Sequence, residues 1–180
     1  MAATMTPSDE ATREQLELAR QQGQALEAAL RVMIQDEAHG AERQVGDYRV
    51  GYAVEHAEGM YRLMAGELVW FEPQDENAHI EISVRDAADG RFIPGLNVRL
   101  TLLDENEQSV GTHEQPFLWH PWLYHYGRNW VLPGSGTYTL RVHIEAPEFG
   151  RHDKHNGQRY AESVDIAFPG VFIETGQKKS

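Results

Sequence analysis

The sequence predicts an all-β protein, an antiparallel β-sandwich preceded by one long helix. Two observations support this prediction. From Val45 onward the chain consists of short runs of alternating apolar and polar residues, which Gly, Pro, Asp and Asn separate. Before Val45 it contains the one long stretch with helical periodicity. Because each alternating strand has one apolar face to bury, roughly seven antiparallel strands are expected to pack as two sheets.

The helical pattern covers residues 8–37, and Thr6 or Ser8 is expected to cap its start. Gln, Glu and Arg occupy most of its surface, so its apolar face is narrow. This composition predicts an amphipathic helix that docks on the β domain or on a partner chain; a half-ordered extension is the alternative. The apolar positions with a helical period are Leu16, Ala19, Leu26, Leu30 and Met33.

Strands are expected along the rest of the chain, and Ala65-Gly66 is expected to form the turn of a hairpin. In order, they cover residues 48–54, 60–64, 67–71, 79–85, 97–102, 137–145 and 161–168. The chain therefore divides into a helical extension (1–44), a sandwich (45–172) and a C-terminal tail (173–180).

The stretch from Gln115 to Pro133 interrupts the strand pattern. Aromatic residues and two histidines are concentrated in its first half, at residues 117–126. A loop this apolar is not left in water. We therefore expect it to fold onto the domain, to insert into a partner or to form the wall of a site.

Composition excludes several classes of function. The 180 residues include 16 Lys and Arg against 28 Asp and Glu, and the net charge of −12 argues against binding to nucleic acid or to anionic membranes. The absence of Cys excludes thiolate zinc sites, Cys-ligated iron–sulfur clusters and cysteine nucleophiles. No apolar run is long enough to span a membrane, and no signal peptide is apparent. These features predict either a cytoplasmic protein or a mature chain whose export signal has been removed.

His79 and Glu81 are the first candidate metal ligands. They lie on the same face of the expected strand 79–85, because side chains alternate along a strand. Their Cβ atoms are expected about 6.5–7 Å apart, which leaves room for a metal ion between an imidazole and a carboxylate. The pair alone is a weak signal, since an exposed polar strand face also explains it.

Further histidines lie where strands are expected to end. His120 and His125 belong to the aromatic stretch, and His152 follows the long strand 137–145. Strand ends meet at the rim of a sandwich, so these imidazoles are expected to converge there. Neutral imidazole is a common metal ligand, and neighbouring carboxylates and aromatic rings orient it. His39, His56, His113 and His155 lack comparable neighbours and are expected at the surface.

Four motifs, taken in order, resemble the bacterial periplasmic iron-transport protein family, whose members bind copper and iron and are encoded beside iron permeases. The motifs are His79-Ile80-Glu81, His125-Tyr126-Gly127, Leu132-Pro133-Gly134-Ser135-Gly136-Thr137-Tyr138 and Pro147-Glu148-Phe149-Gly150-Arg151-His152-Asp153. The similarity covers roughly residues 45–172. It implies an immunoglobulin-like sandwich in the periplasm, commonly a homodimer, that binds Cu(II) and assists iron uptake by an inner-membrane iron permease.

The resemblance also implies a ligand set of His79, Glu81, His125 and His152. The family's methionine ligand has no counterpart, because Leu118 occupies that position in ungapped register and cannot bind a metal. If the loop shifts, His120 supplies the missing ligand. Imidazole in place of a thioether weakens Cu(I) binding and favours Cu(II), Zn(II) or Fe(II).

We therefore expect a metal-binding accessory of a transport system with one transition-metal ion per chain, Cu(II) before Fe or Zn(II). Tyr126, Asp153 and Trp119 are expected to surround the ligands and orient them. Partners of other kinds, namely nucleic acid and a membrane into which the chain inserts, are not expected. Two alternatives stay open. One is a metalloenzyme with a two-His-one-carboxylate site, which a fourth histidine and the lack of a cosubstrate motif make less favourable. The other is a metal-free recognition module.

Overall fold

The structure of the chain, a computed structural model, describes residues 4–36 and 39–179. In this part of the chain one helix, α1 (Arg13–Asp36), precedes eleven strands. The strands are β1 (His39–Val45), β2 (Tyr48–Glu55), β3 (Met60–Met64), β4 (Glu67–Phe71), β5 (Ala78–Asp86), β6 (Val98–Leu103), β7 (Ser109–Glu114), β8 (Phe117–Trp119), β9 (Tyr124–Trp130), β10 (Gly136–Ile144) and β11 (Val164–Ile173).

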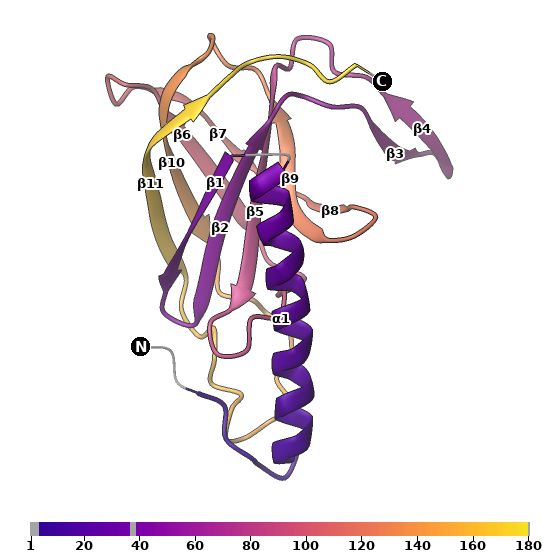
Figure 1. Cartoon of the computed structure of the whole chain (residues 1–180), viewed down its shortest axis with the longest axis vertical. Helices are drawn as coiled ribbons and strands as arrows, with labels where there is room; N and C mark the ends of the chain where they lie inside the picture. Colours follow the sequence, from indigo (N-terminus) through magenta and orange to yellow (C-terminus); the bar gives the residue numbers. More distant parts are fainter. Residues whose placement is uncertain (1–3, 37–38, 180) are drawn as a thin grey trace.

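Nine of these strands form two sheets that pack face to face (Figure 1). One sheet has the order β1-β2-β5-β9-β8 and the other the order β11-β10-β6-β7, and all neighbouring strands are antiparallel. Apolar side chains fill the space between the sheets, among them Val50, Ile80, Leu100, Leu140 and Ile144. The predicted fold class, an antiparallel β-sandwich with an N-terminal helix, is confirmed.

β5 lies in the middle of the five-stranded sheet and carries polar residues on one face. Ile80, Ile82 and Val84 belong to the core between the sheets. His79 and Glu81 therefore project from the opposite, outer face, because strand side chains alternate. All nine residues of β5 are nevertheless buried. Other parts of the chain must cover the outer face at this point.

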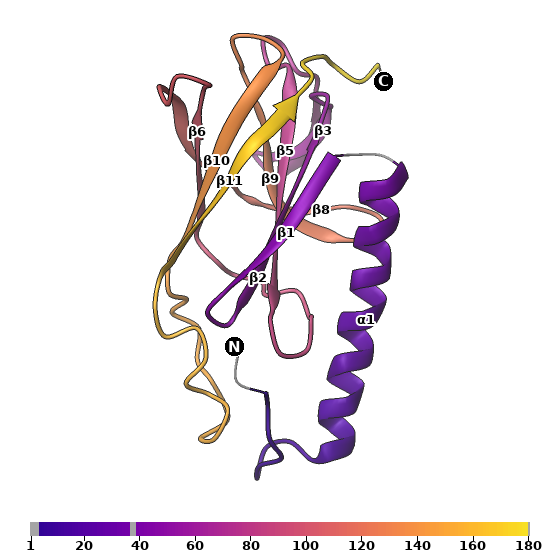
Figure 2. The same cartoon turned by 60° about the vertical axis from the view of Figure 1, so that its left-hand side comes forward.

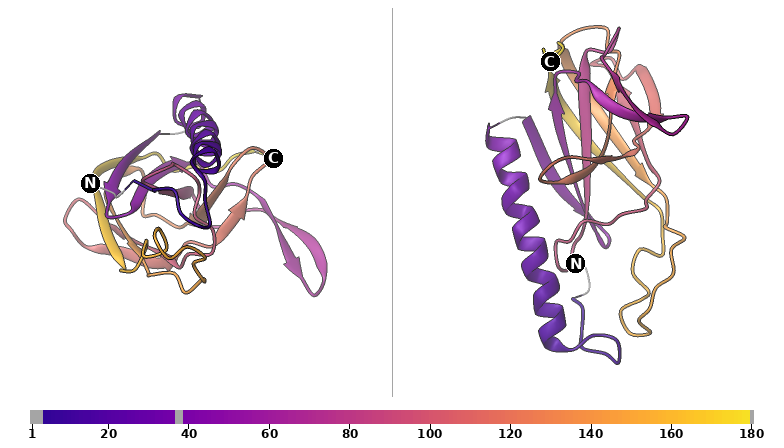
Figure 3. Two further views of the ribbon diagram at one scale, coloured as in Figure 1. Left: turned by 90° about the horizontal axis from the view of Figure 1, so that it is seen from below. Right: turned by 90° about the vertical axis from the view of Figure 1, so that its right-hand side faces the viewer.

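Helix α1 provides much of that cover. It runs along the outer face of the five-stranded sheet (Figures 2 and 3). Leu26, Leu30 and Met33 pack against Ala53 of β2 and Leu123 of the connection between β8 and β9. Docking of the helix on the β domain, one of the two arrangements expected from its composition, is thus what the structure shows. Among the described residues, no helix is both long and apolar enough to cross a membrane.

The start of α1 differs from the prediction. Thr12 Oγ1 accepts a hydrogen bond from the Gln15 backbone N–H at 3.2 Å, and Gln15 Oε1 accepts one from the Thr12 N–H at 2.8 Å. This reciprocal pair is a capping box, so the predicted cap at Thr6 or Ser8 was wrong. The Ser8 hydroxyl instead donates to Asp153 Oδ2 at 2.7 Å, which joins the N-terminal segment to the loop after β10. The predicted last residue of the helix, at position 37, lies outside the described residues.

The aromatic stretch from Gln115 to Pro133 is not an irregular loop. It contains β8 and β9, which pair through Phe117 with Tyr126 and Trp119 with Tyr124. Tyr126 and Trp130 enter the core between the sheets. The interruption of the strand pattern was therefore misread, because the outer-face residues of β9 lie under other parts of the chain and do not alternate clearly with its core residues.

Strands β3 and β4 form a separate hairpin that projects from the sandwich (Figure 1). The predicted turn at Ala65-Gly66 is confirmed, and both residues have a positive φ, of 50° and 91°. Such a turn suits glycine at its second position. One face of this hairpin is apolar and exposed, with the side chains of Tyr61, Leu63, Leu68 and Trp70.

Candidate metal centre

Three buried side chains point toward one another on the outer face of the five-stranded sheet. β5 carries His79 and Glu81, and its neighbour β9 carries His125. Glu81 Oε1 lies 3.3 Å from Nε2 of His125 and 3.7 Å from Nε2 of His79. In the described part of the chain, these residues form the group whose candidate ligand atoms all lie within 4.8 Å of one another. We refer to them as the His79–Glu81–His125 group.

The spacing of the three ligand atoms suits a metal ion. Two atoms that are each about 2.1 Å from a tetrahedral ion lie about 3.4 Å from each other. The measured separations of 3.3 and 3.7 Å lie on either side of that value. Imidazole nitrogen and carboxylate oxygen together suit Cu(II), Zn(II) and Fe(II).

Because Gly127 has no side chain, the two imidazole rings can lie close to its backbone. It lies opposite Glu81 in the register of β5 and β9. A Cβ atom at this position would lie 3.1 Å from Cδ2 of His125 and 3.3 Å from Nε2 of His79. Any larger residue would press on both rings, so this glycine belongs to the geometry of the site.

Asn129 fixes the orientation of the His79 ring. Its Oδ1 accepts a hydrogen bond from Nδ1 of His79 at 2.8 Å, and its Nδ2 donates to the backbone oxygen of Glu58 at 2.7 Å. Because Nδ1 of His79 carries the proton, Nε2 presents its lone pair toward Glu81. Hydrogen bonds of this kind orient the histidines of metal sites.

Both imidazoles are neutral at physiological pH. Burial lowers the pKa of His79, which the Glu58 carboxylate only partly offsets. Burial, with the neighbouring rings of His79 and His120, lowers the pKa of His125 to about 3. A neutral imidazole has the lone pair that a metal ion needs, so neither ring has to lose a proton before it binds.

Several ring nitrogens of the group have no hydrogen-bond partner among the described residues. They are Nε2 of His79 and both ring nitrogens of His125. A buried polar atom without a partner costs about 1–3 kcal/mol, so it calls for an explanation. A bound cation satisfies Nε2 of both rings at once, and the residues present therefore fit a metal ion.

A second carboxylate borders the group. Oε1 of Glu58 lies 3.8 Å from Nε2 of His79. Lys178 donates to Oε2 of Glu58 at 3.0 Å and also to Glu55. Burial disfavours the charged ammonium, but these hydrogen bonds outweigh it and raise the pKa of Lys178. A cationic side chain thus neutralises part of the acidic charge beside the site.

Sequence reasoning missed two residues that contact the group. Asn129 lies opposite His79 in β9, so a correct pairing of the two strands identifies it. Glu58 follows the end of β2, and no local pattern marks it.

His120 lies beside the group but does not join it. Its ring centroid is 6.4 Å from that of His125 and 5.8 Å from that of Trp122. With Glu58 and Glu81 it lines a cavity of about 20 Å³. Its Nδ1 is buried, and none of the described residues gives it a hydrogen bond. His120 therefore forms part of the wall around the group.

The structure does not bring His152 or Asp153 to the group within a single chain. The His152 side chain is 96% exposed, and its Nδ1 lies 3.2 Å from a carboxylate oxygen of Glu10. Asp153 accepts hydrogen bonds from Ser8 and Asn156. Both residues belong to the loop between β10 and β11, which contacts the segment before α1.

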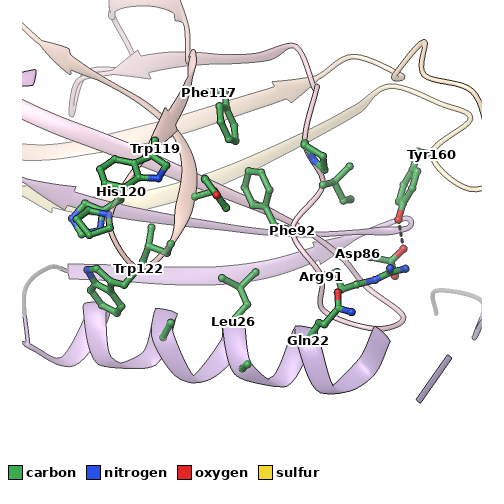
Figure 4. Close-up of a pocket in the computed structure, with 17 residues that line it drawn as sticks. Gln22, Leu26, Asp86, Arg91, Phe92, Phe117, Trp119, His120, Trp122 and Tyr160 are labelled. Carbon is green, nitrogen blue, oxygen red and sulfur yellow. Dashed lines mark hydrogen bonds between the residues drawn. The ribbon is translucent and has the colours of Figure 1, made fainter. Parts of the chain in front are cut away.

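Tyr126 and Trp119 also lie away from the three side chains. Tyr126 is on the core side of β9, where its hydroxyl donates to the backbone oxygen of Ile93 at 2.8 Å. Trp119 is exposed on β8. With His120 and Trp122 it lines one end of an open pocket of about 1060 Å³ between α1 and the sheet (Figure 4). In this pocket Leu26 of α1 points toward the aromatic residues.

Several solved structures have the same fold. FetP from uropathogenic Escherichia coli strain F11, recombinantly expressed in the periplasm of E. coli, is 18% identical, with a TM-score of 0.61 over 76% of this chain and 94% of that chain. Copper-reconstituted P19 from Campylobacter jejuni is 16% identical, with a TM-score of 0.63 over 79% of this chain and 98% of that chain. A copper-bound variant of FetP is 18% identical, with a TM-score of 0.59 over 76% and 98%. The curated proteins include no match.

At these identities the likeness establishes the fold. The family assignment has a separate basis, since the model of a protein family described as Fe2+ transport protein matches residues 64–169. That range covers more than half of the chain and includes His79, Glu81 and His125, while α1, β1 and β2 precede it. The chain belongs to the Fe2+ transport protein family.

Proposed function

We propose that this chain is a metal-binding accessory protein of iron uptake, which holds one transition-metal ion at His79, Glu81 and His125. One observation carries the proposal. Two buried imidazoles direct Nε2 atoms that lack a hydrogen-bond partner among the described residues toward the same carboxylate, at 3.3 and 3.7 Å. Without a cation, folding removes water from these two Nε2 atoms, and the described residues give them no hydrogen bond in its place.

Cu(II) is the ion we expect to bind most tightly. Sites built from nitrogen and oxygen donors follow the order in which Cu(II) exceeds the other divalent first-row metals. Zn(II) and Fe(II) are expected to bind the same ligands more weakly. Copper-bound forms of FetP and P19 are consistent with this assignment.

The size of the site favours metal binding over catalysis. The cavities that border Glu81 have volumes of about 40 and 20 Å³. Each admits an ion or a water molecule, whereas pockets for organic substrates usually measure about 300–1,000 Å³. The large pocket lined by Trp119 adjoins the smaller cavity through His120, Trp122 and Leu123, but His79, Glu81 and His125 do not line it.

We place this function in the periplasm, beside an inner-membrane iron permease, and we expect the chain to act as a homodimer. Membership of the Fe2+ transport protein family and expression of the FetP structure in the periplasm support the location. The net charge of −12 supports a role with cations, because it raises their concentration near the surface.

Metal titration of purified variants tests the proposal. Wild-type protein is expected to bind one Cu(II) per chain, measured by calorimetry and by metal analysis after desalting. His79→Ala and His125→Ala are expected to weaken binding by at least about 10-fold each. His143→Ala is the matched control, since His143 lies on β10 and pairs with Asp165. Unchanged stoichiometry and affinity in both site variants would exclude this centre.

A further inference from the structure

Helix α1 places one methionine beside the His79–Glu81–His125 group. Met33 is only 5% exposed, although it lies on the long helix at the N-terminal side of the domain. It lines the cavity of about 40 Å³ that His125 and Glu81 also line. It also lines the cavity of about 20 Å³ that Glu58 and Glu81 line. Met33 and Glu81 are therefore the two residues that line both cavities. His125 lines the larger one and Glu58 the smaller one.

The fold holds Met33 in this place from two sides. Met33 packs against Ala53 and Leu123. Ala53 is the direct cross-strand partner of Glu81 in the pairing of β2 with β5, so the two side chains share a face of the sheet. Leu123 accepts a hydrogen bond from the backbone N–H of His120 at 3.1 Å, which closes the turn between β8 and β9. Both of its packing partners thus belong to elements that build the metal centre.

The chemistry of a thioether differs from that of the other donors. Sulfur is soft and selects Cu(I), whereas imidazole and carboxylate also accept Cu(II), Zn(II) and Fe(II). Among the described residues that line the two cavities, Met33 is the one with a sulfur atom. The unbranched methionine side chain adapts readily to a nearby ion.

We propose that Met33 is a ligand of the bound copper ion and that it gives the site affinity for Cu(I). The inference rests on the proposed function, since it concerns the metal at the His79–Glu81–His125 group. The ligand comes from the helix, outside residues 64–169 that match the family model. Helix α1 is then a part of the metal centre and sets its preference between the two oxidation states of copper.

The full-length protein provides the test. Cu(I) affinity is measured without oxygen by competition with a chromophoric chelator, Cu(II) affinity by calorimetry, and the donor atoms by X-ray absorption. Met33→Leu nearly keeps the volume and the apolar character of the side chain while it removes the sulfur, so its effect on folding is expected to be small. Met64→Leu is the matched control, because Met64 is exposed on the projecting hairpin.

We expect a sulfur donor in the Cu(I) form of the wild type and its loss in Met33→Leu. The Cu(I) affinity of that variant is expected to fall by about 10-fold or more, and its Cu(II) affinity to change by less than about 3-fold. Met64→Leu is expected to match the wild type. The absence of sulfur from the wild-type spectrum, which does not depend on any variant, overturns the proposal, as does an unchanged Cu(I) affinity in Met33→Leu.

His79→Ala separates this proposal from the proposed function. If His79→Ala loses Cu(II) while Met33→Leu binds Cu(I) like the wild type, the metal centre stands and Met33 is a packing residue. If the wild type binds neither oxidation state of copper, both proposals fail.

Discussion

At the scale of single residues, the proposed metal centre depends on groups that are not among its proposed ligands. Asn129 holds the proton of His79 on Nδ1 through a 2.8 Å hydrogen bond and so directs Nε2 at Glu81. Gly127 has no side chain and leaves room for both rings. The ligands are therefore arranged before any ion arrives, which reduces the ordering required on binding.

Replacement of Gly127 by alanine tests this arrangement. The added Cβ would lie 3.1 Å from His125 and 3.3 Å from His79, so the rings have to move apart. We expect the Cu(II) affinity of Gly127→Ala to fall by about 10-fold, because small displacements of ligands weaken metal sites strongly. Gly134→Ala is the control, since nothing lies within 4 Å of its Cβ position. Equal affinities in the two variants, measured by calorimetry, would show that the gap at Gly127 is not required.

The low pKa of His125 predicts how stability depends on pH in the metal-free protein. The folded chain takes up a proton on this residue only near pH 3, whereas an unfolded histidine does so near its usual pKa of about 6.5. Between these values the unfolded state binds more protons, so the free energy of unfolding falls as the pH falls, by up to about 1.4 kcal/mol per pH unit for this residue. The stabilisation is present in full above pH 6.5.

Urea denaturation between pH 4 and pH 7 measures this dependence on the chelator-treated protein. We expect His125→Gln to show a shallower decline than the wild type, because glutamine does not titrate. Identical slopes would mean that His125 is protonated in the folded chain at these pH values.

At the scale of secondary structure, the predictions succeeded where the local pattern matched the final environment. β5 and β10 alternate clearly, and both were predicted to within a few residues. β1 was missed because it lies at a sheet edge and five of its seven residues are exposed, so no apolar face marks it. β9 was missed because its outer face is buried under another part of the chain.

The candidate site, as a cluster of side chains, was predictable to a similar extent. His79 and Glu81 followed from alternation along one strand. His125 required the pairing of strands that are distant in sequence, and here a family resemblance took the place of a physical argument. Glu58 and Met33 depend on the docking of other segments over the sheet, which no local pattern encodes.

The contact between α1 and the loop after β5 supplies a prediction at this scale. Replacement of glycine by alanine inside a helix usually stabilises it by up to about 1 kcal/mol. At Gly23, however, a Cβ atom would lie 1.8 Å from the backbone oxygen of Asp89. The helix therefore has to shift, and we expect Gly23→Ala to destabilise the protein by about 1–3 kcal/mol. Thermal unfolding measures this effect, with Gly134→Ala as the control variant. A rise in the melting temperature of Gly23→Ala would contradict the close approach of α1 to Asp89.

At the scale of the whole molecule, the N-terminal segment is joined to the loop between β10 and β11, the longest loop of the described residues. Asn156 exchanges hydrogen bonds with the backbone of Thr6, at 3.0 and 2.9 Å. Arg159 of the same loop donates to both carboxylate oxygens of Asp86, at 2.9 and 3.0 Å. The loop between β10 and β11 thereby links the N-terminal segment to the end of β5, the strand that carries two of the proposed ligands.

The overall charge of −12 predicts a salt dependence of metal capture. A negative field raises the rate at which cations arrive, and salt screens it, because the Debye length shortens from about 30 Å at 10 mM to about 8 Å at 150 mM. We expect the association rate of Cu(II), measured by stopped-flow quenching of tryptophan, to fall several-fold over this range. The dissociation rate is expected to change little, since the ligands are buried. A rate of association that does not respond to salt would contradict long-range attraction.

The position of α1 ahead of the strands on which it docks has a consequence for biosynthesis. The ribosome makes the helix before its docking surface, which includes Ala53 and Leu123, and Leu123 is added about 90 residues after Met33. The apolar face of the helix therefore stays uncovered until Leu123 has been translated. Closure of the proposed metal centre is then a late event of maturation, and a nascent chain that stalls before residue 123 has neither His125 nor the complete docking surface of the helix.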